Sequence, residues 1–167
     1  MLPFVCAQKE KMITEQLPRL TKSVILQIED NLEDVELFRL AVAQSGSPCK
    51  VVSVQYARDA IKYLARIGDY ADPVKFPKPT LIVLDLSLPG MTGLEFLAWA
   101  KGEPPENVPP IAVLSSSQLE LNRHLSEKLG AKAYFIKSPE PVEAAEITRC
   151  LLLFNAPPSS YAEPNPA

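Results

Sequence analysis

Three carboxylate side chains and one lysine follow short apolar segments of the chain. Glu29 and Asp30 follow one segment, Asp85 a second and Lys137 a third. Carboxylates held together repel one another unless a cation lies among them, and oxygen ligands favour a hard ion such as Mg²⁺. Such an ion and a lysine would suit a phosphoryl group, whose transfer needs positioning and charge neutralisation above all. A carboxylate can itself be the nucleophile and form an acyl phosphate.

Asp85 is the best candidate for that nucleophile. It ends the most hydrophobic segment and precedes a turn through Gly90 that can leave it facing a crevice. A hydroxyl, Ser115, ends a fourth apolar segment. Taken alone, a strand-end serine usually bonds to backbone, a lysine is usually solvated, and an acidic pair such as Glu29 and Asp30 usually caps a helix. The hypothesis therefore depends on these groups lying together.

Five apolar segments rich in β-branched residues have the length of buried strands. They are residues 24–28, 50–54, 80–84, 111–114 and 133–136. Each precedes a segment with helical periodicity. The first predicted helix is capped by Asn31 or Asp34 and stops before Gly46, and the others are residues 57–67 (closed by Gly68), 94–100, 118–129 and about 141–154.

Three of these helices show an apolar stripe expected to face the core. The stripes are Val35, Phe38, Ala41 and Val42; Ile61, Leu64 and Ala65; and Leu121, Leu125 and Leu129. Alternating strands and helices predict an α/β doubly wound parallel sheet with helices on both faces. In such a sheet the carboxyl ends of the strands line a crevice, where the charged residues above would meet.

Length and composition set the domain organisation. The chain has 167 residues and 47% hydrophobic residues, which predicts one domain, residues 23–154. Residues 1–22 lack a sustained period and are predicted to be an N-terminal arm. Residues 155–167 are rich in proline and small residues and are predicted to be a flexible tail. No output domain is expected after the tail.

Several functional classes are disfavoured by composition. The net charge of -3 argues against direct nucleic-acid binding. Three cysteines without CxxC spacing and a single histidine, His124, give no zinc cluster. No apolar run approaches the roughly 18 to 20 residues of a membrane span, and no signal peptide is recognisable. We therefore expect a cytoplasmic protein.

The chain resembles the receiver domains of two-component response regulators over residues 23–154. The motifs are Ile-Glu-Asp-Asn at 28–31, Leu-Asp-Leu-Ser-Leu-Pro-Gly-Met-Thr-Gly at 84–93, Val-Leu-Ser-Ser-Ser at 113–117 and Tyr-Phe-Ile-Lys at 134–137. The Glu-Asp-Asn opening and the Leu-Ser-Ser-Ser ending are similar to single-domain regulators paired with phytochrome-type sensor kinases. The resemblance implies a flavodoxin-like fold with strand order 2-1-3-4-5.

The resemblance also implies a role for each site residue. Asp85 would accept a phosphoryl group from a kinase histidine, Lys137 would contact its oxygens, and Ser115 would move to hydrogen-bond it while Tyr134 enters the vacated space. The ligands of Mg²⁺ would be Glu29, Asp30, Asp85 and the backbone carbonyl of Ser87. Ser87 and Ser117 would flank the attacking water and tune the lifetime of the phosphorylated state.

The implied partners are a sensor histidine kinase and a second copy of the chain. The dimer face would comprise the fourth predicted helix, the fifth strand and the fifth helix. One departure concerns Ser138, which stands where the family usually has a proline in a cis peptide. A cis bond to Ser138 would cost about 2.5 to 4 kcal/mol.

Two other functions remain open. One is a degenerate receiver that binds partners constitutively, which the full set of charged groups disfavours. The other is an aspartyl phosphohydrolase of the haloacid-dehalogenase type, which expects a second aspartate where this chain has Ser87. A nucleotide- or flavin-binding fold is weaker still, because no glycine-rich loop follows the first strand. No separate catalytic domain is expected.

Overall fold

The computed structural model describes residues 23–104 and 106–154, so the predicted arm (1–22) and tail (155–167) lie outside the described residues. The strands are β1 (Val24–Ile28), β2 (Lys50–Val54), β3 (Leu81–Leu84), β4 (Ile111–Ser115) and β5 (Ala133–Ile136). The helices are α2 (Leu32–Gln44), α3 (Ala57–Ala65), the 3₁₀ turn η2 (Gly68–Tyr70), α4 (Gly93–Gly102), α5 (Glu120–Lys128) and α6 (Pro141–Phe154).

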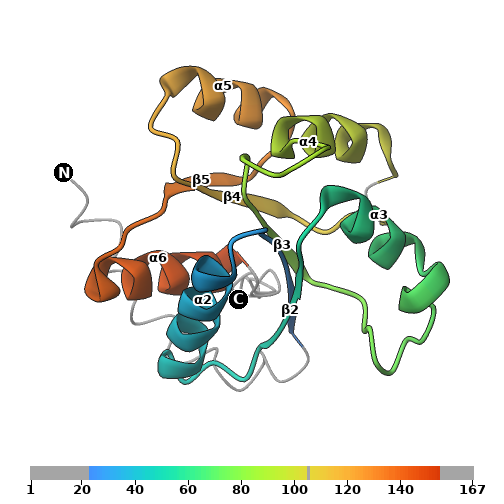
Figure 1. Cartoon of the computed structure of the whole chain (residues 1–167), viewed down its shortest axis with the longest axis horizontal. Helices are drawn as coiled ribbons and strands as arrows, with labels where there is room; N and C mark the ends of the chain where they lie inside the picture. The colour runs from blue at the N-terminus through green and yellow to red at the C-terminus, as the bar shows by residue number, and fades with distance from the viewer. Residues whose placement is uncertain (1–22, 105, 155–167) are drawn as a thin grey trace, which may run out of the picture.

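The strands form one parallel sheet in the order β2-β1-β3-β4-β5, which confirms the predicted fold and strand order. Helices α2 and α6 lie on one face of the sheet, and α3, α4 and α5 lie on the other (Figure 1). The chain passes from β1 outward to β2 and then across to β3. The carboxyl ends of β1 and β3 therefore meet at a topological switch point.

The two faces of the sheet carry separate apolar clusters. Along β3, Ile82 and Leu84 pack with the α3 and α4 side, whereas Leu81 and Val83 pack with the α2 and α6 side. All four side chains of β3 are buried, as expected for a strand covered on both faces. This rigid centre fixes the backbone from which Asp85 projects.

Helix α2 is capped by one of the two residues that the sequence predicts for this role, Asn31 or Asp34. Asn31 is the N-cap of α2, because its side-chain oxygen accepts hydrogen bonds from the backbone nitrogens of Glu33 and Asp34. Asp34 is thus not the cap, and its carboxylate is available for other contacts. The predicted buried positions of this helix are confirmed: Val35, Phe38, Ala41 and Val42.

The apolar face predicted for α3 is confirmed in part, because Ile61 and Leu64 are partly buried against the core. Ala57, Ala60 and Tyr63 are the buried residues, whereas Ala65 is exposed. The Tyr63 hydroxyl donates a hydrogen bond to the carbonyl of Pro77, which turns this aromatic side chain inward. The helix also ends before Gly68, because Arg66 adopts the left-handed conformation with φ of 56°.

The stripe predicted for α5 is wrong at Leu121, whereas Leu129 packs against the core. Leu121 is 65% exposed and Leu125 and Leu129 are only partly buried, while Ser126 is the buried residue of this helix. Helix α5 packs beside β5, an edge strand that offers less sheet surface than a central strand.

No helix within the described part of the chain is long and apolar enough to span a membrane.

Candidate functional site

The parallel ladder continues one residue beyond the strands and fixes the backbone of each candidate residue. The amide of Glu29 donates to the carbonyl of Val54 at 3.0 Å, and the amide of Asp85 donates to Ile28 at 3.0 Å. On the other side, the amide of Lys137 donates to the carbonyl of Ser115 at 2.9 Å. These bonds join the ends of β1, β2 and β3 and those of β4 and β5, and β3 pairs with β4, so the polar side chains after the strands gather at one edge of the sheet.

Three of the predicted carboxylates form one cluster. Glu29, Asp30 and Asp85 each offer an oxygen, and these oxygens lie within 4.8 Å of one another. At Mg²⁺–oxygen distances of about 2.1 Å, neighbouring ligand oxygens of an octahedral site lie about 3 Å apart, so the side chains would have to draw closer together to bind one ion. The donors are oxygen atoms only, and Asp30 is exposed while Glu29 and Asp85 are buried. The cluster therefore fits a hard divalent cation with water completing its shell.

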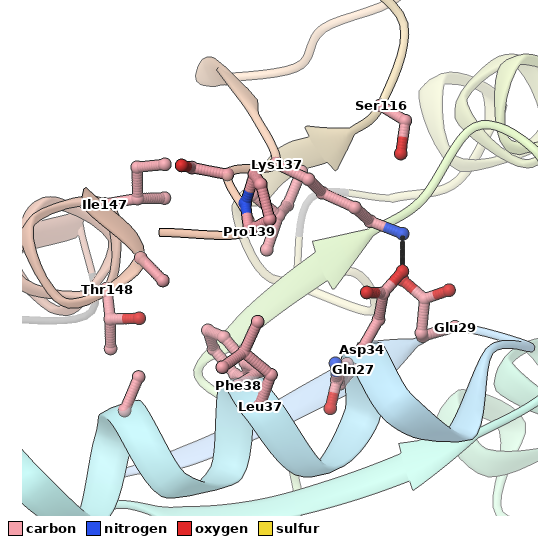
Figure 2. A pocket seen from close by; sticks show the side chains of 14 residues that line it. Gln27, Glu29, Asp34, Leu37, Phe38, Ser116, Lys137, Pro139, Ile147 and Thr148 are labelled. Carbon is pink, nitrogen blue, oxygen red and sulfur yellow. Dashed lines mark hydrogen bonds and ion pairs between the residues drawn. The ribbon is translucent and has the colours of Figure 1, made fainter. Parts of the chain in front are cut away.

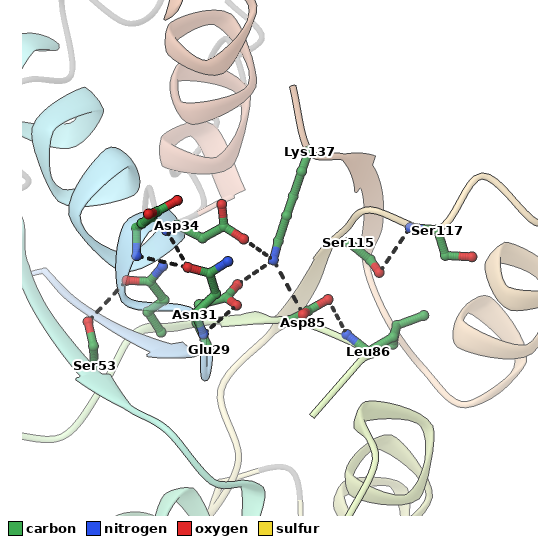
Figure 3. A network of polar contacts seen from close by, with 11 residues as sticks. Glu29, Asn31, Asp34, Ser53, Asp85, Leu86, Ser115, Ser117 and Lys137 are labelled. Carbon is green, nitrogen blue, oxygen red and sulfur yellow. Dashed lines mark hydrogen bonds and ion pairs between the residues drawn. The ribbon is translucent and has the colours of Figure 1, made fainter. Parts of the chain in front are cut away.

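Lys137 extends into this cluster from the end of β5, as Figure 3 shows. Its Nζ atom lies 2.6 Å from Oε2 of Glu29, 2.8 Å from Oδ2 of Asp34 and 3.3 Å from Oδ2 of Asp85. Its side chain is only 14% exposed. Burial lowers the pKa of Lys137, but hydrogen bonds to Asp34 and Glu29 and the charge of Asp85 raise it overall above its usual value. The surrounding carboxylates thus stabilise the charged form of the lysine.

For Glu29, the effect of burial on the pKa is larger than the effect of its contacts with Lys137. Burial raises the pKa of this carboxyl group, the hydrogen bond and charge of Lys137 lower it, and the charge of Asp85 raises it again. The overall direction is upward. Burial of Glu29 thus outweighs its contacts with Lys137 and is the main reason why its pKa lies above the usual value.

Asp34 is a site residue that the sequence analysis did not identify. It lies in the first turn of α2, five residues after Glu29, and its carboxylate reaches Lys137 across the sheet edge. The available signal was positional: the first turn of a helix that follows a short loop lies beside the end of the preceding strand. An acidic residue there shares the edge with those at the strand end.

The loop after β3 orients Asp85. The amide of Leu86 donates to Oδ1 of Asp85 at 2.7 Å, leaving Oδ2 as the oxygen nearest to Lys137. The chain then turns through Gly90, whose φ is 76°, and the amide of Gly93 donates back to the carbonyl of Leu86 at 3.0 Å. Ser87, the predicted carbonyl ligand, lies in this turn with an exposed side chain.

Ser115 and Tyr134 lie on the β4–β5 side of the site. Ser115 is fully buried, and its hydroxyl accepts a hydrogen bond from the amide of Ser117 at 3.3 Å. The Tyr134 hydroxyl donates to the carbonyl of Ser117 at 2.9 Å. Ser117 is therefore the shared partner of the two predicted switch residues. The described residues contain no cis peptide bond, so the Lys137–Ser138 bond is trans.

A cavity of about 220 Å³ opens between α2 and α6 beside the acidic cluster (Figure 2). Lys137, Asp34 and Glu29 lie at its polar end, while Phe38 and Ile147 line its apolar part. The cavity thus ends at the lysine and its carboxylate partners.

Comparison with known proteins gives a consistent result. The model of the response regulator receiver domain family matches residues 25–149. The chain is 32% identical over 115 residues to response regulator Rcp1 of Synechocystis, covering 69% of this chain and 76% of Rcp1. It is 32% identical over 129 residues to two-component response regulator ARR5 of Arabidopsis thaliana, covering 75% of this chain and 66% of ARR5. The chain thus spans just under two thirds of ARR5.

Two solved structures resemble the fold closely. The phosphorylated cyanobacterial phytochrome response regulator RcpA has a TM-score of 0.71 and 35% identity, covering 79% of this chain and 92% of RcpA. The Mn²⁺-bound form of Rcp1 has a TM-score of 0.70 and 28% identity, covering 87% of this chain and 99% of that one. One of these relatives has thus been observed phosphorylated and the other with a divalent metal ion.

Proposed function

Because the chain belongs to the response regulator receiver domain family, we propose that it is a phosphorylation-controlled signalling switch that accepts a phosphoryl group on Asp85 from a sensor histidine kinase. The observation that carries this proposal is the position of Asp85, which is 6% exposed, belongs to the acidic cluster and lies 3.3 Å from Nζ of Lys137. In the transfer, a bond forms between an Asp85 oxygen and phosphorus. The bond from phosphorus to the kinase histidine breaks, and its electron pair returns to the histidine nitrogen.

Glu29, Asp30, Asp85 and the backbone carbonyl of Ser87 would hold Mg²⁺. This ion would neutralise charge on the phosphoryl oxygens during transfer. The oxygen-only donor set of the cluster and the Mn²⁺-bound form of the relative Rcp1 support this assignment. Lys137 would contact a phosphoryl oxygen from the β5 side.

The output would be a changed binding surface. The Ser115 hydroxyl would hydrogen-bond the phosphoryl group, and the shared contact of Ser115 and Tyr134 with Ser117 would transmit the change to β5 and α5. We propose that α5, β5 and α6 form the face for homodimerisation. Two exposed leucines at the start of α5, Leu119 (66%) and Leu121 (65%), support an interface there.

A phytochrome-type kinase is the proposed phosphoryl donor. The support is similarity to RcpA, which is described as a phytochrome response regulator, at 35% identity. Phosphotransfer from candidate kinases, compared by the rate of label transfer to this chain, would identify the preferred donor.

Intact-mass spectrometry tests the phosphoacceptor. Wild type, Asp85→Asn and Asp69→Asn are incubated with Mg²⁺ and acetyl phosphate; Asp69 is an exposed aspartate outside the site and serves as the matched control. We expect one phosphoryl adduct on wild type and Asp69→Asn, none on Asp85→Asn, and loss of labelling after chelation. Labelling of Asp85→Asn would overturn the assignment. Unlabelled wild type would favour a constitutive binding module, and steady hydrolysis of p-nitrophenyl phosphate would favour a phosphohydrolase.

A further inference from the structure

The ammonium group of Lys137 contacts two of the three carboxylates that could hold a metal ion. It contacts Oε2 of Glu29 at 2.6 Å and Oδ2 of Asp85 at 3.3 Å, and both carboxylates belong to the group of potential metal ligands. A divalent cation and an ammonium group repel each other at such distances. For Glu29 and Asp85 to turn toward a cation, Lys137 must withdraw from Glu29 while remaining near Asp85.

Asp34 offers the lysine a place to withdraw to. Its Oδ2 lies 2.8 Å from Nζ of Lys137, nearer than that of Asp85, and Asp34 does not belong to the metal-ligand group. The Asp34 side chain is 33% exposed and that of Glu29 only 4%, so the carboxylate of Asp34 lies nearer to solvent. Figure 3 shows Asp34 and Glu29 approaching Nζ from one side and Asp85 from the other.

Local structure leaves the Asp34 carboxylate available for this contact. The side-chain oxygen of Asn31 satisfies the backbone nitrogens of Glu33 and Asp34 at the start of α2. A negative charge in the first turn of a helix is also favourable with respect to the helix dipole. Asp34 is thereby held at a fixed position between the helix start and the tip of Lys137.

We propose that Asp34 is a positioning residue that holds the ammonium group of Lys137 on the α2 side of the acidic cluster. This contact frees Glu29 and Asp85 to bind a divalent cation and keeps Lys137 close enough to meet a phosphoryl group on Asp85. The inference rests on the proposed function and adds to it a carboxylate that binds neither metal nor phosphoryl group. Asp34 affects metal binding only through its contact with Lys137.

Mg²⁺ binding to the unphosphorylated full chain tests this role by isothermal titration calorimetry. Asp34→Asn should raise the dissociation constant of Mg²⁺ roughly tenfold, because Lys137 would then stay against Glu29 and Asp85; coupling of this size is common between residues of one ion-pair network. Glu33→Gln removes an equal charge from the same helical turn, but Glu33 makes no ion pair with Lys137. This control should leave the dissociation constant within a factor of about two.

The decisive comparison places the same change in a Lys137→Met background. If Asp34 acts through the lysine, Lys137→Met alone should tighten Mg²⁺ binding, and adding Asp34→Asn should then have little further effect. An equal loss in both backgrounds would show that Asp34 acts only by its charge, and unchanged binding of Asp34→Asn would show that it has no role. Either result overturns the proposal. Asp34→Ser provides a second variant if Asp34→Asn does not fold.

The outcome is separate from that of the phosphoacceptor test. A wild type that binds Mg²⁺ and is phosphorylated on Asp85, together with an Asp34→Asn variant that binds Mg²⁺ equally well, rejects the role of Asp34 alone. A wild type that takes up no phosphoryl group while its Mg²⁺ affinity depends on Asp34 through Lys137 rejects the phosphoacceptor alone.

Discussion

The hydroxyl group of Tyr134 donates a hydrogen bond to the backbone carbonyl of Ser117, with 2.9 Å between the two oxygens. This contact joins β5 to the loop that follows β4. The amide of the same Ser117 donates to the buried hydroxyl of Ser115, and the guanidinium of Arg123 lies 5.0 Å from the centre of the Tyr134 ring. A movement of Ser115 toward Asp85 would therefore disturb the contact that holds Tyr134.

Tyr134→Phe tests this connection by removing one hydroxyl group. We expect the free energy of unfolding to fall by about 1 kcal/mol, the usual net value of one hydrogen bond. Urea unfolding measures the change, and Tyr56→Phe, at a 49% exposed tyrosine, is the control. Phosphorylation-dependent dimerisation, followed by analytical ultracentrifugation, should weaken in Tyr134→Phe only. An identical response from the two variants would contradict the coupling.

Gly93 is required where α4 passes close to the phosphoacceptor loop. A Cβ atom at this position would lie 2.6 Å from Cα of Leu86 and closer still to the carbonyl oxygen of Asp85. Gly93→Ala should therefore destabilise the fold by roughly 1 to 3 kcal/mol and displace Asp85. Gly102→Ala, at the other end of the same helix, meets no atom within 4 Å. Thermal unfolding should show a lower midpoint for Gly93→Ala and not for Gly102→Ala.

The sequence predicts the sheet better than it predicts the helical faces. The bounds of β1, β2 and β5 agree with the predicted segments, which are short apolar runs rich in β-branched and aromatic residues, as strands are. In α3 the sequence predicts the partly buried Ile61 and Leu64 but not the buried Tyr63, whose hydroxyl contacts the carbonyl of Pro77, 14 residues further along the chain. Periodicity within one helix cannot reveal such a contact.

The sequence predicts most of the charged residues of the candidate site but not all of them. Glu29, Asp30, Asp85 and Lys137 were identifiable because each directly follows a strand, and the structure brings their side chains together. Asp34 was missed because its contact with Lys137 spans 103 residues and depends on how α2 approaches the sheet edge. The choice of Asn31 as N-cap, which leaves the Asp34 carboxylate available, was one of two alternatives open from the sequence.

Addition of Mg²⁺ should stabilise the unphosphorylated protein. A ligand that binds only the folded state at a hundredfold excess over its Kd contributes about 2.7 kcal/mol. Differential scanning fluorimetry should show a rising Tm for wild type, a much smaller rise for Asp30→Asn, and reversal by EDTA. Asp69→Asn, outside the cluster, should behave as wild type. An equal rise for Asp30→Asn would exclude this carboxylate as a ligand.

Lys137→Ala should destabilise the metal-free protein in a pH-dependent manner. The variant leaves the buried Glu29 and Asp85 carboxylates without their cation, and breaking such a buried pair costs roughly 3 kcal/mol. Because Lys137 lowers the pKa of Glu29, its removal should raise that pKa further above the unfolded value of about 4.3. A carboxyl group whose pKa is higher in the folded state favours folding below the unfolded pKa and loses that contribution as the pH rises.

The difference in unfolding free energy between wild type and Lys137→Ala should therefore be small near pH 4 and grow toward pH 7. Urea unfolding in EDTA at a series of pH values measures it. Lys62→Ala removes an exposed ion pair with Asp59 and should change stability little across the same range, because solvent screens that pair. A difference for Lys137→Ala that stays constant with pH would show that its carboxylate partners remain ionised without it. Restoration of stability at pH 7 by Mg²⁺ would show that a second cation can take over the neutralising role of the lysine.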